Sequence, residues 1–343
     1  MVNGIIDFLR YPAIGDEDGL YSFGAARVRA MESSLLGRNT LVEMAQAGDF
    51  AMACDVLAGS DYSEISQRKT PAAVEGVLEE KRFAVNEVIE HCCYEPKLIE
   101  VFKSSSDYTN IRLAARRIVT ERNIGDGYNN FGNVAAVTFQ WAVEQENYDL
   151  WPEFMQDAFE QAILIYYNTK DVRQIDNVID QMEAEYRVET ALELNVPYLL
   201  GLFRTQIDLV NIRTLLRLKW AEVENKQAFL PGGYLEQSRL WRALADDYDG
   251  IRANFYALPY YEVVDVGINY LTAQDSFIAL EMMCDDHILG YAKEASRVTS
   301  GVQPIIAYVI KKQIEIKMVR MVLAGKRNQI EAGVLLERLG EEI

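Results

Sequence analysis

Apolar residues recur along most of this chain at steps of three and four, the spacing that places them on one face of an α-helix. One such series runs through Val172, Ile175, Ile179, Met182 and Tyr186. No run shows sustained alternation of period two, and no turn signal joins two β-branched stretches. The pattern therefore predicts an all-α protein.

Capping residues and loops divide this helical pattern. Thr70 followed by Pro71 predicts the capped start of a long helix, and Asp171 is a suitable N-cap for another. Residues 125–132 contain three Gly and two Asn, and residues 231–233 read Pro-Gly-Gly. Such compositions are typical of loops that need positive φ. We expect both loops to separate structural units.

One ten-residue phrase occurs twice, at residues 107–116 and 208–217, 101 positions apart. Each copy reads Asp, two other residues, Asn-Ile-Arg, three other residues and Arg. Self-similarity at a fixed period indicates a repeat architecture, so the chain is predicted to be built from related units.

The repeat extends upstream and has a third copy. Residues 74–79 and 175–180, also 101 apart, share the order apolar, acid, any, apolar, apolar, acid. Residues 280–285 repeat that order, and residues 312–320 resemble the ten-residue phrase with Glu in place of Asn. The predicted organisation is an N-terminal extension at 1–20, then helical repeats at 21–123, 124–226 and 227–343.

Each repeated helix carries a small polar group beside its apolar face. A buried polar side chain at a helix crossing must find hydrogen-bond partners, so its usual function is to fix the register of packing. We interpret five residues in this way: Asp107, Asn110, Asp208, Asn211 and Glu315.

Charge is segregated onto the same three helices. Residues 107–122, 204–219 and 311–327 together contain 14 Lys or Arg and 4 acids, although the whole chain has a net charge of −18. Either these basic faces form a positive docking surface, or they neutralise acids on adjacent helices. The equivalent basic positions, which we predict to contact a partner, are Arg112, Arg116, Arg213, Arg217, Lys317 and Arg320.

The overall charge and the remaining composition exclude several classes of partner. A net charge of −18 opposes binding to nucleic-acid phosphates or anionic lipid. No apolar stretch approaches the roughly 20 residues of a membrane span, and the first residues lack a signal-peptide pattern. The four Cys show no disulfide or CxxC spacing, so we expect reduced thiols and a cytoplasmic location.

Candidate chemistry is sparse. Cys284, Asp285, Asp286 and His287 offer metal ligands, but the repeat pattern predicts that Cys284 lies in the core and Asp285 at the surface. The chain has only 2 His and no GxxxxGK[ST] phosphate loop. We expect no catalytic site, cofactor or metal. Two alternatives remain: a generic cytoplasmic helical adaptor without a role in ion transport, and an enzyme using Asp285, Asp286 and His287.

A threefold helical repeat with this phrase resembles one family, the central-stalk subunit of V/A-type rotary ATPases. Members are known as the C subunit in archaeal and bacterial complexes and as the d subunit in the vacuolar enzyme. Residues 1–20 are not covered, and the 125–132 loop departs from the family's Pro-Gly-Gly form. The matching segments, in order, are residues 21–29 with the following Glu32, Leu35 and Leu36, then residues 60–62, 107–116, 207–219, 231–235 and 303–326.

The resemblance implies three helical domains arranged pseudo-threefold as a funnel. Such a funnel would stand on the cytoplasmic rim of the membrane rotor ring and receive the tip of the central shaft. The chain would then be a non-catalytic coupling subunit, peripheral to the membrane, in a machine that moves protons or sodium ions.

Overall fold

The computed structural model describes residues 11–125 and 127–341, and over these residues it contains helices and loops without a β-strand. The prediction of an all-α protein is confirmed. Residues 1–10 of the predicted N-terminal extension lie outside the described residues. The α-helices are α1 (Ser22–Glu32), α2 (Arg38–Gln46), α3 (Phe50–Val56), α4 (Ser63–Arg68), α5 (Pro71–Cys92), α6 (Pro96–Thr120), α7 (Ala136–Glu144), α8 (Glu153–Thr169), α9 (Arg173–Glu193), α10 (Pro197–Trp220), α11 (Gln237–Ala245), α12 (Tyr248–Phe255), α13 (Tyr261–Gln274), α14 (Ile278–Glu294), α15 (Val302–Arg327) and α16 (Ala332–Arg338).

Local signals locate the helix starts well. Thr70 caps α5 by accepting a hydrogen bond from the Ala73 amide, with Pro71 in the first turn, as the sequence predicts. Asp171 also accepts a hydrogen bond from a backbone amide, that of Arg173, at 3.0 Å. Helix α9 then begins at Arg173. Its start therefore falls two residues after the expected cap.

Three long helices, α6, α10 and α15, carry the repeated phrase. They contain 25, 24 and 26 residues and have Pro96, Pro197 and Pro304 in their first turns. Proline is tolerated there because the first amides of a helix have no intrahelical partner. Helix α15 is buried over most of its circumference, as expected for a helix that other helices surround.

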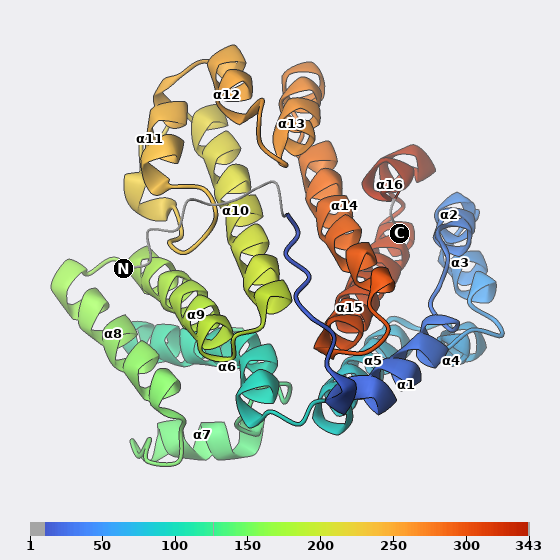
Figure 1. Cartoon of the computed structure of the whole chain (residues 1–343), viewed down its shortest axis with the longest axis horizontal. Helices are drawn as coiled ribbons and strands as arrows, with labels where there is room; N and C mark the ends of the chain where they lie inside the picture. The colour runs from blue at the N-terminus through green and yellow to red at the C-terminus, as the bar shows by residue number, and fades with distance from the viewer. Residues whose placement is uncertain (1–10, 126, 342–343) are drawn as a thin grey trace.

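Each long helix packs with shorter helices around a hydrophobic core (Figure 1). One core joins α6 to α7, α8 and α9 through Tyr108, Phe139 and Trp151. A second joins α10 to α11–α14 and includes Phe255 and Tyr260. In the figure the first group lies at lower left and α11–α13 lie at the top.

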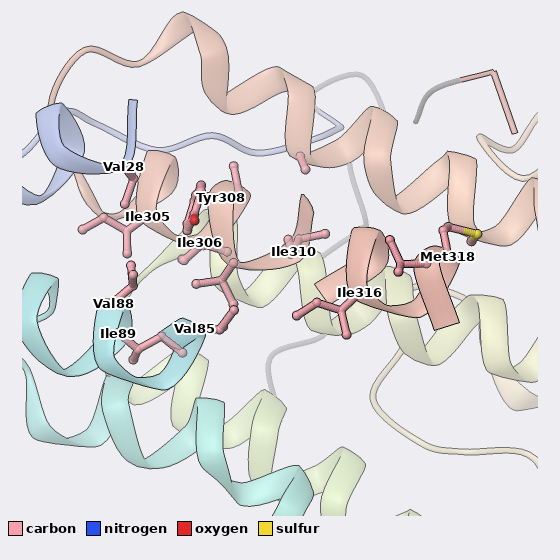
Figure 2. Close-up of a cluster of buried hydrophobic side chains, with 14 of the residues drawn as sticks. Val28, Val85, Val88, Ile89, Ile305, Ile306, Tyr308, Ile310, Ile316 and Met318 are labelled. Carbon is pink, nitrogen blue, oxygen red and sulfur yellow. The ribbon is translucent and has the colours of Figure 1, made fainter. Parts of the chain in front are cut away.

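The third core unites the two ends of the chain. Helix α15 packs on α1, α2, α3 and α5, with α16 beside α2. Figure 2 shows Val28 of α1 and Val88 of α5 meeting Ile305 and Ile306 of α15, although more than 200 residues separate them in sequence. This core therefore closes the molecule by joining its first helices to its last long helix.

The cores group the helices differently from the repeat boundaries. In each core, the long helix that ends one sequence repeat packs on the shorter helices that begin the next repeat. The predicted repeats at 21–123, 124–226 and 227–343 stay a prediction about sequence units. Within the described part of the chain, no helix has both the length and the apolar character needed to cross a membrane.

A short N-terminal segment crosses between α10 and α14 before α1 begins (Figure 1). Gln303 donates to the carbonyls of Ile14 and Asp16, each at 3.0 Å, and the Asp18 amide donates to the Ser300 carbonyl. The Tyr11 hydroxyl lies 2.7 Å from Nε2 of His287. The segment thus fastens the second core to the N-terminal end of α15.

Candidate functional site

The repeated Asp and Asn of α6 bind one loop. Asp107, which is fully buried, accepts hydrogen bonds from the Asn133 amide at 2.9 and 3.0 Å. Asn110 exchanges two hydrogen bonds with the backbone of Asn129, at 2.9 and 3.0 Å. The polar pair on the helix thereby satisfies the backbone of a loop that has no regular secondary structure.

The second copy repeats this arrangement with different side chains in the loop. Asp208 accepts from the amides of Tyr234 and Leu235, both at 3.0 Å. Asn211 exchanges hydrogen bonds of 2.7 and 3.0 Å with the backbone of Leu230. Every acceptor and donor position is 101 residues from its counterpart in the first copy, so the loop contact belongs to the repeat.

Glycine is required where each loop meets the carboxylate. A Cβ on Gly132 would lie 2.2 Å from Oδ1 of Asp107, and one on Gly233 would lie 2.1 Å from Oδ1 of Asp208. Composition indicates a loop around each glycine but does not by itself predict this contact. The sequence does contain a signal for this contact, because Asp and Gly are separated by 25 residues in both copies.

Burial changes the acidity of both carboxyl groups. It raises the pKa of Asp107 to about 6 and that of Asp208 to about 7, although hydrogen bonds from the loop amides oppose the shift. Asp208 also accepts a hydrogen bond of 2.7 Å from the Tyr260 hydroxyl.

The third copy replaces this arrangement with a buried ion pair. Lys312 stands in the position of Asp and lies 2.6 Å from Glu315, which stands in the position of Asn. Glu315 accepts hydrogen bonds from the hydroxyl of Tyr62, at 2.7 Å, and from the amide of Leu36. The residues that Glu315 contacts outside α15 therefore come from the beginning of the chain, which matches the way the third core is built.

The basic residues of α6 and α10 lie against acidic helices. Arg112 pairs with Asp180, and Arg116 pairs with Asp176, both on α9. On the next copy, Arg213 and Arg217 pair with Glu281 of α14 at 3.0 and 2.7 Å. These acids occupy the acidic positions of the upstream repeat pattern.

The third basic helix completes the series. Arg320 of α15 pairs at 2.6 Å with Glu75 of α5, the first acid of the first upstream pattern. Lys317 instead pairs at 2.8 Å with Asp285 of α14. Apart from Lys317, the basic residues thus pair with the acidic helix of the following copy, and Arg320 of α15 returns to α5 of the first copy. Arg217 and Lys317 keep about half of their side-chain surface exposed, at 57% and 50%.

Pairing with acids on adjacent helices, one of the two alternatives from the sequence, is therefore present for all six predicted basic residues. Contact with a partner is a separate property and stays a prediction. The expectation that Asp285 lies at the surface is wrong. It is 7% exposed, because Lys317 and Arg338 both converge on its carboxylate.

Cys284 and His287, two members of the candidate metal cluster at residues 284–287, pack and bond within the protein itself. Cys284 is buried in the second core, as predicted, and burial raises the pKa of its thiol to about 12. Burial also lowers the pKa of His287 to about 4, and its ring contacts Tyr11. Over the residues that the structure describes, no group of three or more His, Cys, Asp or Glu side chains is arranged to hold a metal ion.

Over the described residues, fold and site together define an all-helical scaffold in which each of three related long helices is tied by ion pairs to an acidic helix of another repeat. The chain belongs to the ATP synthase (C/AC39) subunit family, whose model matches residues 25–338. It is 19% identical to the C subunit of the V-type sodium ATPase of Enterococcus hirae, over 91% of this chain and 95% of that protein. It is 22% identical to the C subunit of the A-type ATP synthase of Methanocaldococcus jannaschii, over 89% and 82% of the two chains.

Proposed function

We propose that this protein is the non-catalytic coupling subunit of a V/A-type rotary ATPase. It links the rotating central shaft to the membrane rotor ring at the cytoplasmic face of the membrane. The observation that carries the proposal is the family match over residues 25–338, combined with the relatives' names as rotary ATPase subunits.

The closed series of ion pairs supports this mechanical function. Torque transfer needs a body that does not shear, and each pairing ties a long helix to the helix group that follows it. We propose that the three groups stand pseudo-threefold as a funnel, whose cavity receives the shaft and whose rim rests on the ring. Coupling of this kind requires neither a cofactor nor a catalytic group.

The shaft would contact the basic faces of the three long helices. Acidic residues on neighbouring helices neutralise part of the positive charge on these faces. The exposed portions of Arg217 and Lys317 would therefore contribute most to docking. The full set of proposed docking residues is Arg112, Arg116, Arg213, Arg217, Lys317 and Arg320.

Binding measurements with the purified shaft and ring subunits test this proposal. We expect native mass spectrometry to show complexes with both. The double variant Arg213→Glu/Arg217→Glu should weaken shaft binding by about tenfold or more, since interface charge reversals act through electrostatic complementarity. Circular dichroism should show unchanged helical content.

A compensating variant provides the control. Adding Glu281→Arg restores the internal ion pairs of that double variant with reversed signs. Weak shaft binding in the triple variant supports docking by the arginines, whereas full recovery would limit their effect to internal packing. Absence of both complexes favours the adaptor alternative, and stoichiometric zinc or iron would favour the enzyme alternative.

A further inference from the structure

Two pockets occupy repeat-equivalent places in the structure but differ in their contents. The first, about 290 Å³, lies between α5, α6 and α15 and is lined by Arg82, Asn86 and Phe102. The second, about 190 Å³, lies between α9 and α10. Its corresponding residues, each 101 positions later, are Glu183, Arg187 and Phe203. The repeat thus supplies an internal comparison between the two pockets.

The second pocket is narrowed by the chain's own side chains. The Arg187 guanidinium lies 4.2 Å from the ring centre of Phe203, where a cation–π contact forms. Arg187 also donates to Gln206 at 2.9 Å and lies 3.7 Å from Glu183. An arginine and a glutamate therefore occupy the space above the phenylalanine ring.

The first pocket lacks this internal pair among its lining residues. Asn86 replaces the arginine and is turned to the loop, where it donates to the Phe131 carbonyl at 3.0 Å. Arg82 replaces the glutamate, so the sign of the charge is reversed. With a shorter side chain in place of Arg187, the space beside Phe102 is left open and the pocket is correspondingly larger.

Arg82 has no acidic partner within salt-bridge distance among the residues that the structure describes. Its guanidinium lies over the Phe131 ring, with 5.8 Å between the guanidinium carbon and the ring centre. Partial burial and the neighbouring Arg320 lower the pKa of Arg82, although the charges of Glu75 and Glu79 oppose the shift. Neither of these acids lines the pocket, and none of the lining residues is Asp or Glu. A carboxylate entering the pocket would therefore meet an arginine that no lining acid already neutralises.

The other walls suit a side chain with an apolar stem and a polar end. Val85 and Ile316 form an apolar floor at the edge of the core where α5 meets α15 (Figure 2). Ser106 and Gln313 supply further hydrogen-bonding groups at the wall. A guanidinium beside hydrogen-bond donors is the arrangement that recognises a carboxylate in proteins.

We propose that this pocket receives an acidic side chain, glutamate or aspartate, from the shaft subunit of the complex. The inference rests on the proposed function and adds to it a specific anchor point. The partner's carboxylate pairs with Arg82 while its stem packs over Phe102 and Val85. It thereby lies over the phenylalanine ring, in the place that Arg187 takes over Phe203 in the second pocket.

Shaft binding by three variants tests the anchor. Arg82→Gln should weaken binding to the purified shaft subunits by about tenfold or more, the loss expected when a charge-assisted pair is removed. The double variant Arg82→Glu/Asn86→Arg has the same net charge as Arg82→Gln and recreates the arginine–glutamate pair of the second pocket, and it should bind as weakly. Arg68→Gln on α4, where the side chain is 69% exposed, is the control and should change binding by no more than about twofold.

The outcomes separate this inference from the proposed function. Normal shaft binding by both Arg82 variants overturns the anchor and leaves the coupling function standing. Recovery of binding in the double variant also overturns it, since a pocket that already holds its own arginine–glutamate pair would then still bind the shaft. Failure of the unmodified chain to bind the shaft overturns both. If calorimetry shows succinate binding the isolated chain through Arg82 while shaft binding ignores Arg82, the pocket holds a small carboxylate instead. Thermal unfolding of each variant verifies that it is folded.

Discussion

At the residue scale, the buried carboxylates of the repeat combine stabilising and destabilising effects. Asp208 lies fully buried and accepts three hydrogen bonds, from two amides and a tyrosine hydroxyl. These bonds favour its charged form, whereas loss of solvation disfavours it and is the larger effect. The result is a pKa of about 7, so the folded state holds a proton that the unfolded state releases near pH 4.

This difference predicts a pH dependence of stability. Between about pH 4 and 7 the folded chain binds more protons at Asp208 than the unfolded chain, so its contribution to unfolding free energy falls as pH rises, by up to ~1.4 kcal/mol per pH unit. Urea unfolding at pH 5, 6 and 7 gives the unfolding free energy of the wild type and of Asp208→Asn. The difference between these two free energies should show this slope. For Asp107→Asn the slope should end about one pH unit lower, near its pKa of about 6. Parallel curves for wild type and Asp208→Asn from pH 5 to 7 would contradict the shifted pKa.

At the element scale, the long helices and their Gly loops form one packing unit. The Pro-Gly-Gly loop lies directly on Asp208, and Gly232 has a φ of +87°. Both positions favour glycine for different reasons, positive φ at Gly232 and close approach at Gly233. We interpret Asp107, Asn110, Asp208, Asn211 and Glu315 as the groups that hold each helix in register with its partner segment.

A pair of glycine substitutions tests the loop contact. Gly233→Ala places a methyl group 2.1 Å from the Asp208 carboxylate, so the loop must move, and we expect a loss of about 2–4 kcal/mol from overpacking and weakened buried hydrogen bonds. Gly76→Ala in α5 meets nothing within 4 Å and should stabilise by about 0.5–1 kcal/mol. Thermal and urea unfolding measure both changes. Equal stability of Gly233→Ala and wild type would show that the loop does not constrain the helix.

At the scale of the whole molecule, the chain is closed by contacts between its ends. Arg320 pairs with Glu75, and Glu315 binds Tyr62 and the Leu36 amide. Helix α15 therefore completes the third core, whose other helices, α1–α5, lie at the beginning of the chain. The proposed coupling function would benefit from such closure, because torque applied to one group of helices would then be carried by the others.

Breaking the buried pair should loosen both ends together. Glu315→Ala leaves Lys312, whose side chain is 4% exposed, without its nearest partner and should cost about 3–5 kcal/mol. Hydrogen exchange should accelerate in α15 and in α2–α4, while α11–α13 keep their protection. The apolar double variant Lys312→Met/Glu315→Leu should restore much of the stability. Exchange that rises in α15 alone would argue against closure through this pair.

The sequence by itself determined the all-α class, the starts of helices such as α5, the three copies of the repeated phrase and the segregation of charge. These follow from local periodicity, capping chemistry and self-similarity, which need no knowledge of contacts. It also indicated that Asp and Asn of the phrase need partners, and the 25-residue Asp-to-Gly spacing could have named one.

Only the tertiary structure decided which helix receives each basic face, since Arg112 and Asp180 are 68 residues apart and Arg320 and Glu75 are 245 apart. It likewise decided that Asp285 is buried, because two cations from α15 and α16 converge there. Pairing of this kind depends on which helices pack against one another in the folded chain. The residues next to a charged side chain in sequence do not determine that packing.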